Sequence, residues 1–213
     1  MVRALVARRR TREPIAYILG RRDFHGATFS VDARVLDEAL IIAAGLSIQD
    51  PRERPADAKQ AADLAHAQFA DPKSDFVAVL KLWEAYSTAH EDLTQSKLRD
   101  WCEKHFLSFL RMREWRELHA QLSQIADELK LRRNELPATY EPLHKALLTG
   151  LLGNVGMKSL EGDDYLGARG IHFHIFPASG LKKARPKWLV SAELTETSKL
   201  YARCVASIQP EFR

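Results

Sequence analysis

Cysteine and long hydrophobic runs are scarce in this sequence of 213 residues. The two cysteines, Cys102 and Cys204, lie far apart and match neither a metal-ligand spacing nor a disulfide framework, which fits the reducing cytosol. The longest apolar run, residues 39–48, is interrupted by Gly45, and a membrane-spanning helix needs about 20 apolar residues. The N-terminal residues lack the apolar core and the cleavage site of a signal peptide. We therefore expect a cytoplasmic protein with no membrane contact and no disulfide scaffold.

A complete phosphate-binding loop is also missing. Residues 153–159 resemble the end of such a loop, but Met157 separates the glycine from the lysine, and the loop needs Gly-Lys-Ser/Thr to be contiguous. Asp37 and Glu38 resemble the metal-binding acidic box of a helicase motor, yet only two apolar residues precede them. Since acidic side chains favour the first turn of a helix, we expect a helix to begin there. We predict no catalytic residue and no cofactor for this chain.

The sequence offers one weak candidate for a metal site. His172 and His174 alternate on a predicted strand, so their imidazoles share one face. A protein zinc site needs three or four ligands, and no third ligand with a convincing spacing accompanies them. We predict no metal, and we expect the two histidines on a face turned to solvent or to RNA.

Charge is divided unevenly along the chain. Residues 1–36 carry a net charge of +5, residues 37–165 carry −6, and residues 166–213 carry +5. This division leaves two interpretations open. Either the basic segments contact a polyanion locally, or the charges form ordinary solvated faces.

Hydrophobic periodicity divides the chain into three parts. Residues 1–36 form a basic segment that ends in a hairpin-like pattern at 24–31, too short to bury a core alone. Residues 37–143 form a helical domain. Its patterns predict a helix over 39–48, an N-cap at Asp71 before Pro72, and a long helical stretch over 98–129 at four-three-four spacing. Residues 144–213 form a β domain.

The β domain follows a short helix that Pro142 opens and Gly153 caps. Its period changes to two, and strands are predicted at 155–160, 165–169, 171–176, 187–197 and 200–208. This strand count is typical of a small antiparallel OB-fold barrel. The predicted fold class is therefore α+β, with a helical bundle followed by an OB-fold barrel.

Basic and aromatic residues gather on this barrel. Cations that track phosphates, beside rings that stack on bases, are typical of proteins that bind single-stranded nucleic acid. The alternative is a solvated loop of flexible lysines. The candidate RNA-binding residues are Arg169, His172, His174, Phe176, Lys182, Lys183, Arg185, Lys187, Lys199, Tyr201 and Arg203.

Several long motifs carry a family resemblance. They are GLSIQDPRERP at 45–55, WCEKHFL at 101–107, ALLTGLL at 146–152, FHIFPASGL at 173–181 and ELTETSK at 193–199. Together they resemble the ratchet and OB-fold domains of DEAH-box RNA helicases of the bacterial HrpA type, over residues 37–212. The resemblance departs at Phe176, where many relatives place a histidine.

The resemblance implies that these domains close a tunnel around single-stranded RNA against two RecA-like motor domains. ATP and Mg²⁺ would be bound by those motor domains, whose motifs this chain lacks, so we expect the chain alone to be inactive as an enzyme. A different resemblance covers REPIAYILGRRDFHGATFSV at 12–31, which is similar to the linker hairpin of release-factor glutamine methyltransferases. The cofactor loop and the catalytic signature of that enzyme are absent, so residues 1–36 look foreign to the remainder.

The sequence thus favours an accessory C-terminal fragment of an RNA helicase that binds single-stranded RNA through its OB-fold. Two other hypotheses stay open. The OB-fold could be a protein-docking module of the helicase, or the chain could be a remnant of a glutamine methyltransferase.

Overall fold

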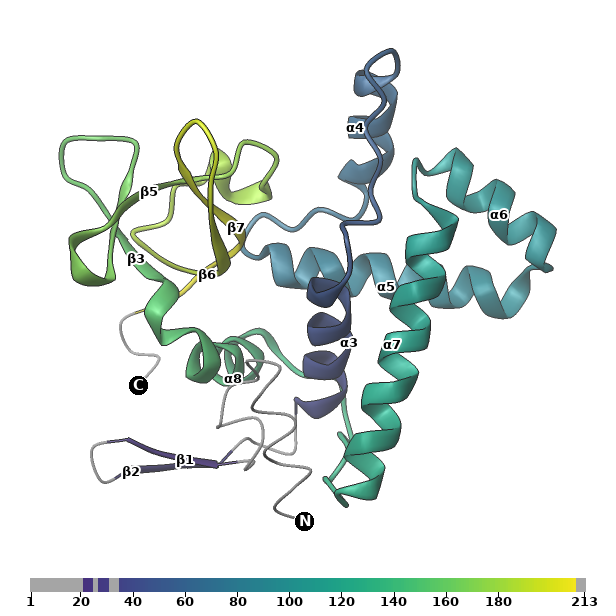
Figure 1. Cartoon of the computed structure of the whole chain (residues 1–213), viewed down its shortest axis with the longest axis horizontal. Coiled ribbons are helices and arrows are strands. Elements are labelled where there is room, and N and C mark those ends of the chain that lie inside the picture. The colour runs from purple at the N-terminus through teal and green to yellow at the C-terminus, as the bar shows by residue number, and fades with distance from the viewer. Residues whose placement is uncertain (1–20, 25–26, 31–34, 210–213) are drawn as a thin grey trace.

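The computed structural model describes residues 21–24, 27–30 and 35–209 (Figure 1). Strands β1 (Arg21–Phe24) and β2 (Ala27–Ser30) pair antiparallel, close to the hairpin pattern predicted at 24–31. The first 20 residues of the basic segment lie outside the described residues. The helices that follow are α3 (Leu36–Ser47), α4 (Lys59–Ala67), α5 (Asp75–Asp92), α6 (Gln95–Lys104), α7 (Phe109–Glu128) and α8 (Tyr140–Leu151). None of the helices in these ranges is long and apolar enough to cross a bilayer.

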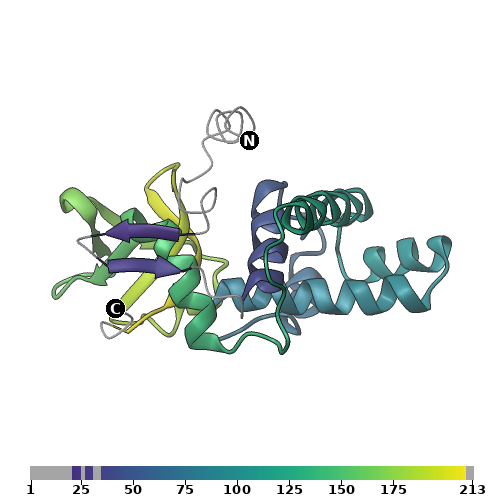
Figure 2. The same ribbon diagram turned by 90° about the horizontal axis from the view of Figure 1, so that it is seen from below.

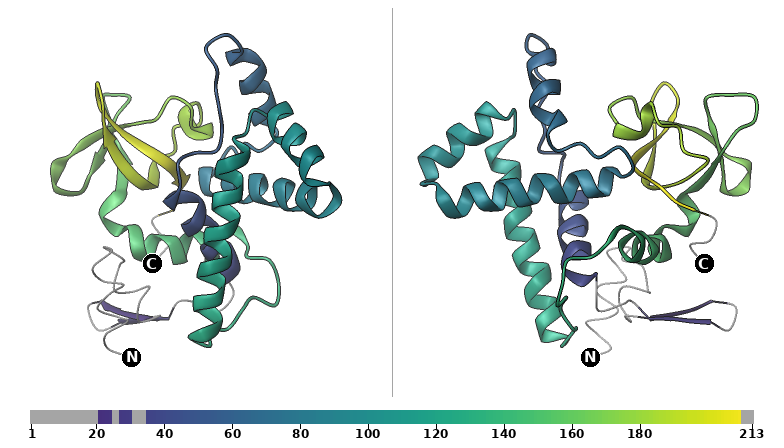
Figure 3. Two further views of the ribbon diagram at one scale, coloured as in Figure 1. Left: turned by 45° about the vertical axis from the view of Figure 1, so that its right-hand side comes forward. Right: turned by 180° about the vertical axis from the view of Figure 1, so that it is seen from behind.

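The core of the helical part surrounds Trp115 of α7. This ring is 1% exposed, and its Nε1 donates a hydrogen bond to the Ile41 carbonyl of α3 at 3.0 Å. The two helices approach closely because Gly45 has no side chain: a Cβ there would lie 2.6 Å from the Trp115 ring. Helices α3 and α7 consequently run side by side, and α5 crosses them (Figures 1 and 3).

Two helix predictions need correction. The stretch predicted over 98–129 is divided into α6 and α7, because Phe106 has a φ of +52° and the chain reverses there. The predicted N-cap at Asp71 is also wrong. Helix α5 begins later, and Ser74 is its N-cap, with its Oγ accepting a hydrogen bond from Val77 N at 3.2 Å. Asp71 accepts from the backbone of Lys73 instead, within the preceding turn.

The β domain is a closed barrel with strand order β3-β4-β5-β7-β6. Its strands are β3 (Val155–Lys158), β4 (Tyr165–Gly167), β5 (His172–Ile175), β6 (Trp188–Glu196) and β7 (Leu200–Ser207), close to the predicted ranges. One pairing, β5 with β7, is parallel and closes the barrel. The predicted α+β class and the OB-type barrel are confirmed.

The barrel interior is filled by large side chains from alternating positions. Phe173 is fully buried and packs against Gly156, where a Cβ would lie 2.4 Å from the Phe173 ring. The prediction that Gly153 caps helix α8 is wrong. The helix instead tightens into the 3₁₀ turn η1 (Leu152–Asn154), which leads into β3. Leu143 and Leu147 of α8 cover the outside of the barrel near Val190.

Helix α5 joins the two parts of the molecule. Its N-terminal end touches the barrel, and its far end leads to α6, so the barrel and α6 lie at opposite ends of the molecule (Figures 1 and 2). Backbone bonds support the barrel contact, with Ser207 N donating to the Lys73 carbonyl at 2.8 Å.

Candidate nucleic-acid interface

Four of the predicted RNA-binding residues share the outer face of β5 and β7. The parallel pairing places His174 opposite Tyr201, and their ring centroids are 6.2 Å apart. Phe176 follows β5 directly, and its ring lies 5.8 Å from that of Tyr201, edge to face. The guanidinium of Arg203 lies over the Phe176 ring, 4.0 Å from its centroid. We call these four residues the β5–β7 face.

The alternation of the strands explains why these side chains point outward. Ile175 and Ala202, the neighbours that pair across the same strands, are 2% and 0% exposed in the barrel core. Because successive side chains of a strand point to opposite sides, the residues that flank Ile175 and Ala202 must face outward. All four members of the β5–β7 face are half-buried.

The basic loop that follows is held by helix α5. Asp75 accepts hydrogen bonds from Ser179 Oγ at 2.6 Å, from Gly180 N at 3.1 Å and from Val205 N at 3.0 Å. Ser179 in turn caps the 3₁₀ turn η3 (Gly180–Lys182) by accepting from Leu181 N. A single carboxylate thus fixes the start of the loop that carries Lys182 and Lys183.

Two other predicted contacts are occupied by acidic residues. Arg185 donates two hydrogen bonds to Asp163, at 2.5 and 3.1 Å. The Nδ1 atom of His172 contacts Asp164 at 2.5 Å, and this hydrogen bond lowers the pKa of the Asp164 carboxyl although burial opposes the shift. Both acids belong to the β3–β4 connection, and neither was among the predicted site residues. This connection is acidic and residues 169–187 are basic, so the opposite charges could have indicated that the two segments pair.

The remaining candidates lie apart from the β5–β7 face. Arg169 belongs to the 3₁₀ turn η2 (Ala168–Gly170) and has a φ of +59°. Lys187 directly precedes β6, and Lys199 lies in the β6–β7 turn, where its carbonyl accepts from Thr197 N. These three side chains are exposed. The structure therefore concentrates rings and one cation on the β5–β7 face and spreads the other cations around it.

A serine–histidine pair elsewhere has the hydrogen bond of a nucleophilic dyad but not its accessibility. Ser74 Oγ and His144 Nε2 are 2.7 Å apart, and both residues are fully buried. Burial also lowers the pKa of His144, and its Nδ1 lies 2.6 Å from the Tyr140 carbonyl. Since no substrate could reach Ser74 Oγ, we assign the pair to the contact between α5 and α8. The described residues also include no cluster of three His, Cys, Asp or Glu side chains that could hold a metal ion.

Comparisons with known proteins identify this arrangement. A family model described as oligonucleotide/oligosaccharide-binding (OB)-fold matches residues 143–212. The "ATP-dependent RNA helicase HrpA homolog" of Haemophilus influenzae is 48% identical over 175 residues, which cover 82% of this chain. The "ATP-dependent RNA helicase HrpA" of Escherichia coli is 47% identical over the same share. Most of this chain is a C-terminal region of the HrpA-type DEAH-box RNA helicases.

The HrpA-type chain corresponds to a C-terminal region of such helicases. It spans 13% of the Haemophilus relative and 14% of the Escherichia relative. A more distant relative, the "Probable ATP-dependent RNA helicase DHX35" of Pongo abelii, is 28% identical over 81% of this chain and 23% of its own length. The predicted resemblance to HrpA-type helicases is confirmed. The resemblance of residues 12–31 to a glutamine methyltransferase stays a prediction.

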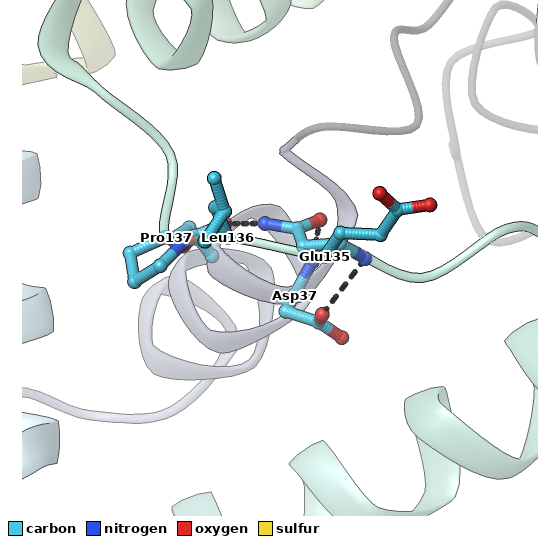
Figure 4. Close-up of a pocket in the computed structure, with 6 residues that line it drawn as sticks. Asp37, Glu135, Leu136 and Pro137 are labelled. Atoms are coloured by element: carbon cyan, nitrogen blue, oxygen red, sulfur yellow. Dashed lines mark hydrogen bonds between the residues drawn. The ribbon is translucent and has the colours of Figure 1, made fainter.

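The acidic pair at the start of α3 is structural in this HrpA-type region. Asp37 accepts from Asn134 N at 3.1 Å and pairs with Arg133, and Glu38 accepts from Asn134 Nδ2 and from Ala138 N at 2.5 and 2.8 Å. Figure 4 shows this contact beside a small open hollow that residues 134–137 form with the first turn of α3. The prediction that these acids begin a helix is confirmed.

Proposed function

We propose that this HrpA-type region binds single-stranded RNA on its barrel, with little dependence on sequence. The observation that carries the proposal is the β5–β7 face, where three rings and the Arg203 guanidinium come together, with further cations spread around it. Rings stack on bases of any identity, and lysines attract the phosphate backbone, so such a surface suits a single strand. The three relatives are all named RNA helicases, which supports RNA as the ligand.

We further propose that the region works as an accessory to motor domains. The relatives are named ATP-dependent, and most of their length lies outside this match. The family's RecA-like domains would bind ATP and Mg²⁺ and would move the RNA past the barrel and the helical part. The proposed units are residues 37–143 and 144–213, with residues 1–36 as a separate segment.

A salt titration of RNA affinity tests the proposal. Each phosphate contact releases counterions, so losing one contact should lower the log–log salt slope by about 0.7 for a single strand. Changing Lys182 and Lys183 to Ala should weaken binding to every RNA sequence alike and lower the slope by roughly 1.4. The matched control changes Lys97 and Lys104 of α6 to Ala, at the end of the molecule far from the barrel (Figure 1).

The outcome also separates the competing hypothesis. If the barrel docks a protein and not RNA, the Lys182/Lys183 double variant should keep the affinity and the slope of the parent. Circular dichroism would establish that both variants retain the fold. An unchanged slope in a folded double variant would contradict the proposed RNA contact of this loop.

A further inference from the structure

Arg203 differs from the other barrel cations in what surrounds it. Its guanidinium lies over the Phe176 ring, whereas Arg185 is bound by a carboxylate. Glu193 lies opposite Arg203 in the β6–β7 register, yet within the described residues Arg203 forms no ion pair with it or with any other acid. Among residues 35–209, the guanidinium is therefore held by a ring and not by a carboxylate.

This arrangement changes the role expected of Phe176. The guanidinium covers one face of the Phe176 ring. The same ring also makes an edge-to-face contact with Tyr201. A base that stacked on this face of Phe176 would have to displace Arg203. The guanidinium itself is planar, is weakly hydrated and stacks on aromatic faces, so it can lie between a protein ring and a nucleobase.

We propose that Arg203 is a stacking platform for one base of the bound strand, with Phe176 as the residue that positions it. The inference rests on the proposed RNA function and specifies how the β5–β7 face is used. Arg203 contacts a base face, and the surrounding lysines contact phosphates. Phe176 contributes through Arg203 and not by stacking on RNA itself.

The test compares Arg203→Lys with the parent chain on two ligands. One is a single-stranded RNA oligonucleotide, and the other is an abasic strand of the same length and charge. Lysine keeps the charge but lacks the flat guanidinium, so stacking worth about 1–3 kcal/mol per base should be lost. We expect Arg203→Lys to bind the base-bearing strand about 5-fold to 150-fold more weakly. Its affinity for the abasic strand and its salt slope should stay unchanged.

Two further variants locate the effect. Phe176→Leu keeps an apolar contact but removes the ring, so it should weaken binding to the base-bearing strand and spare the abasic strand. Arg99→Lys makes the same chemical change at an arginine that also lies over a ring, that of Phe109, but on α6 away from the barrel, so it should alter neither affinity.

The possible results separate this inference from the proposed function. If Arg203→Lys binds the base-bearing strand as tightly as the parent, the platform is wrong although RNA binding stands. An equal loss on both strands would make Arg203 a phosphate contact and would also overturn the platform. If the parent chain shows no salt-dependent RNA binding, the proposed function fails, and the inference fails with it.

Discussion

At the scale of single residues, the buried pair of Ser74 and His144 illustrates how a polar contact stabilises the fold. The Tyr140 carbonyl can only accept, so the Nδ1 atom of His144 carries a proton and donates to it. In the neutral ring, Nε2 then accepts from the Ser74 hydroxyl. Ser74 also caps α5, so one hydroxyl joins the N-terminus of α5 to α8.

This pair predicts a loss of stability in acid. Burial lowers the pKa of His144 below the ordinary 6.5, so its contribution is fully present above pH 6.5. The contribution is lost as pH falls from 6.5 through the lower pKa of the folded state. Urea unfolding at pH 7.5, 6 and 5 should show the decline. His144→Leu should flatten it in part, because burial also lowers the pKa of His119. A pH dependence identical to that of the parent would show that His144 does not titrate in this way.

A second residue-scale prediction concerns Arg185. Because Asp163 already neutralises this guanidinium, Arg185→Ala should lower the salt slope of RNA binding by much less than the 0.7 or so of a free phosphate contact. In an Asp163→Asn background, Arg185→Ala should lower the salt slope by the full amount expected for a free phosphate contact. The matched background is Glu161→Gln, in the same turn, where the effect of Arg185→Ala should stay small. Equal effects of Arg185→Ala in all backgrounds would exclude competition between Asp163 and RNA.

At the scale of elements, the position of the barrel depends on the first residue of α5. Asp75 accepts three hydrogen bonds from residues more than 100 positions away in the sequence. Replacing Asp75 with Asn removes charge-assisted acceptors at a contact between elements, at a cost of about 1–3 kcal/mol in the free energy of unfolding. Urea unfolding followed by tryptophan fluorescence and far-ultraviolet circular dichroism measures the loss. Asp92→Asn, at the other end of α5, is the control and should change little. Equal stability of both variants would contradict this role.

Sequence patterns predicted the elements better than their junctions. The strand positions followed from period-two alternation, as the core residues Phe173 and Ile175 show. The break at Phe106 was missed because an apolar spacing of four-three-four continues across it, and no glycine or proline marks the turn. Ser74 was missed as the N-cap because Asp71-Pro72 carries the stronger local pattern.

The sequence predicted which residues contribute to the site, but it did not predict how their side chains are arranged. Alternation predicted one shared face for His172 and His174, and Tyr201 and Arg203 were placed on another predicted strand. The parallel pairing of β5 with β7, however, joins strands that are not neighbours in the sequence. The contact of Arg203 with Phe176 follows only from that pairing. The neutralisation of Arg185 by Asp163 likewise depends on a turn whose acids look like ordinary solvated residues.

At the scale of the whole molecule, we predict that the purified chain neither binds nor hydrolyses ATP, with or without RNA. Glu38 looks like part of a motor's acidic box, but it accepts hydrogen bonds from Asn134 and Ala138 across the α3 contact. Glu38→Gln should therefore lower the free energy of unfolding by about 1–3 kcal/mol through weakened hydrogen bonds. It should leave phosphate release at the background of a buffer blank. Phosphate release by the parent that RNA stimulates and Glu38→Gln abolishes would show instead that this acid serves a nucleotide site.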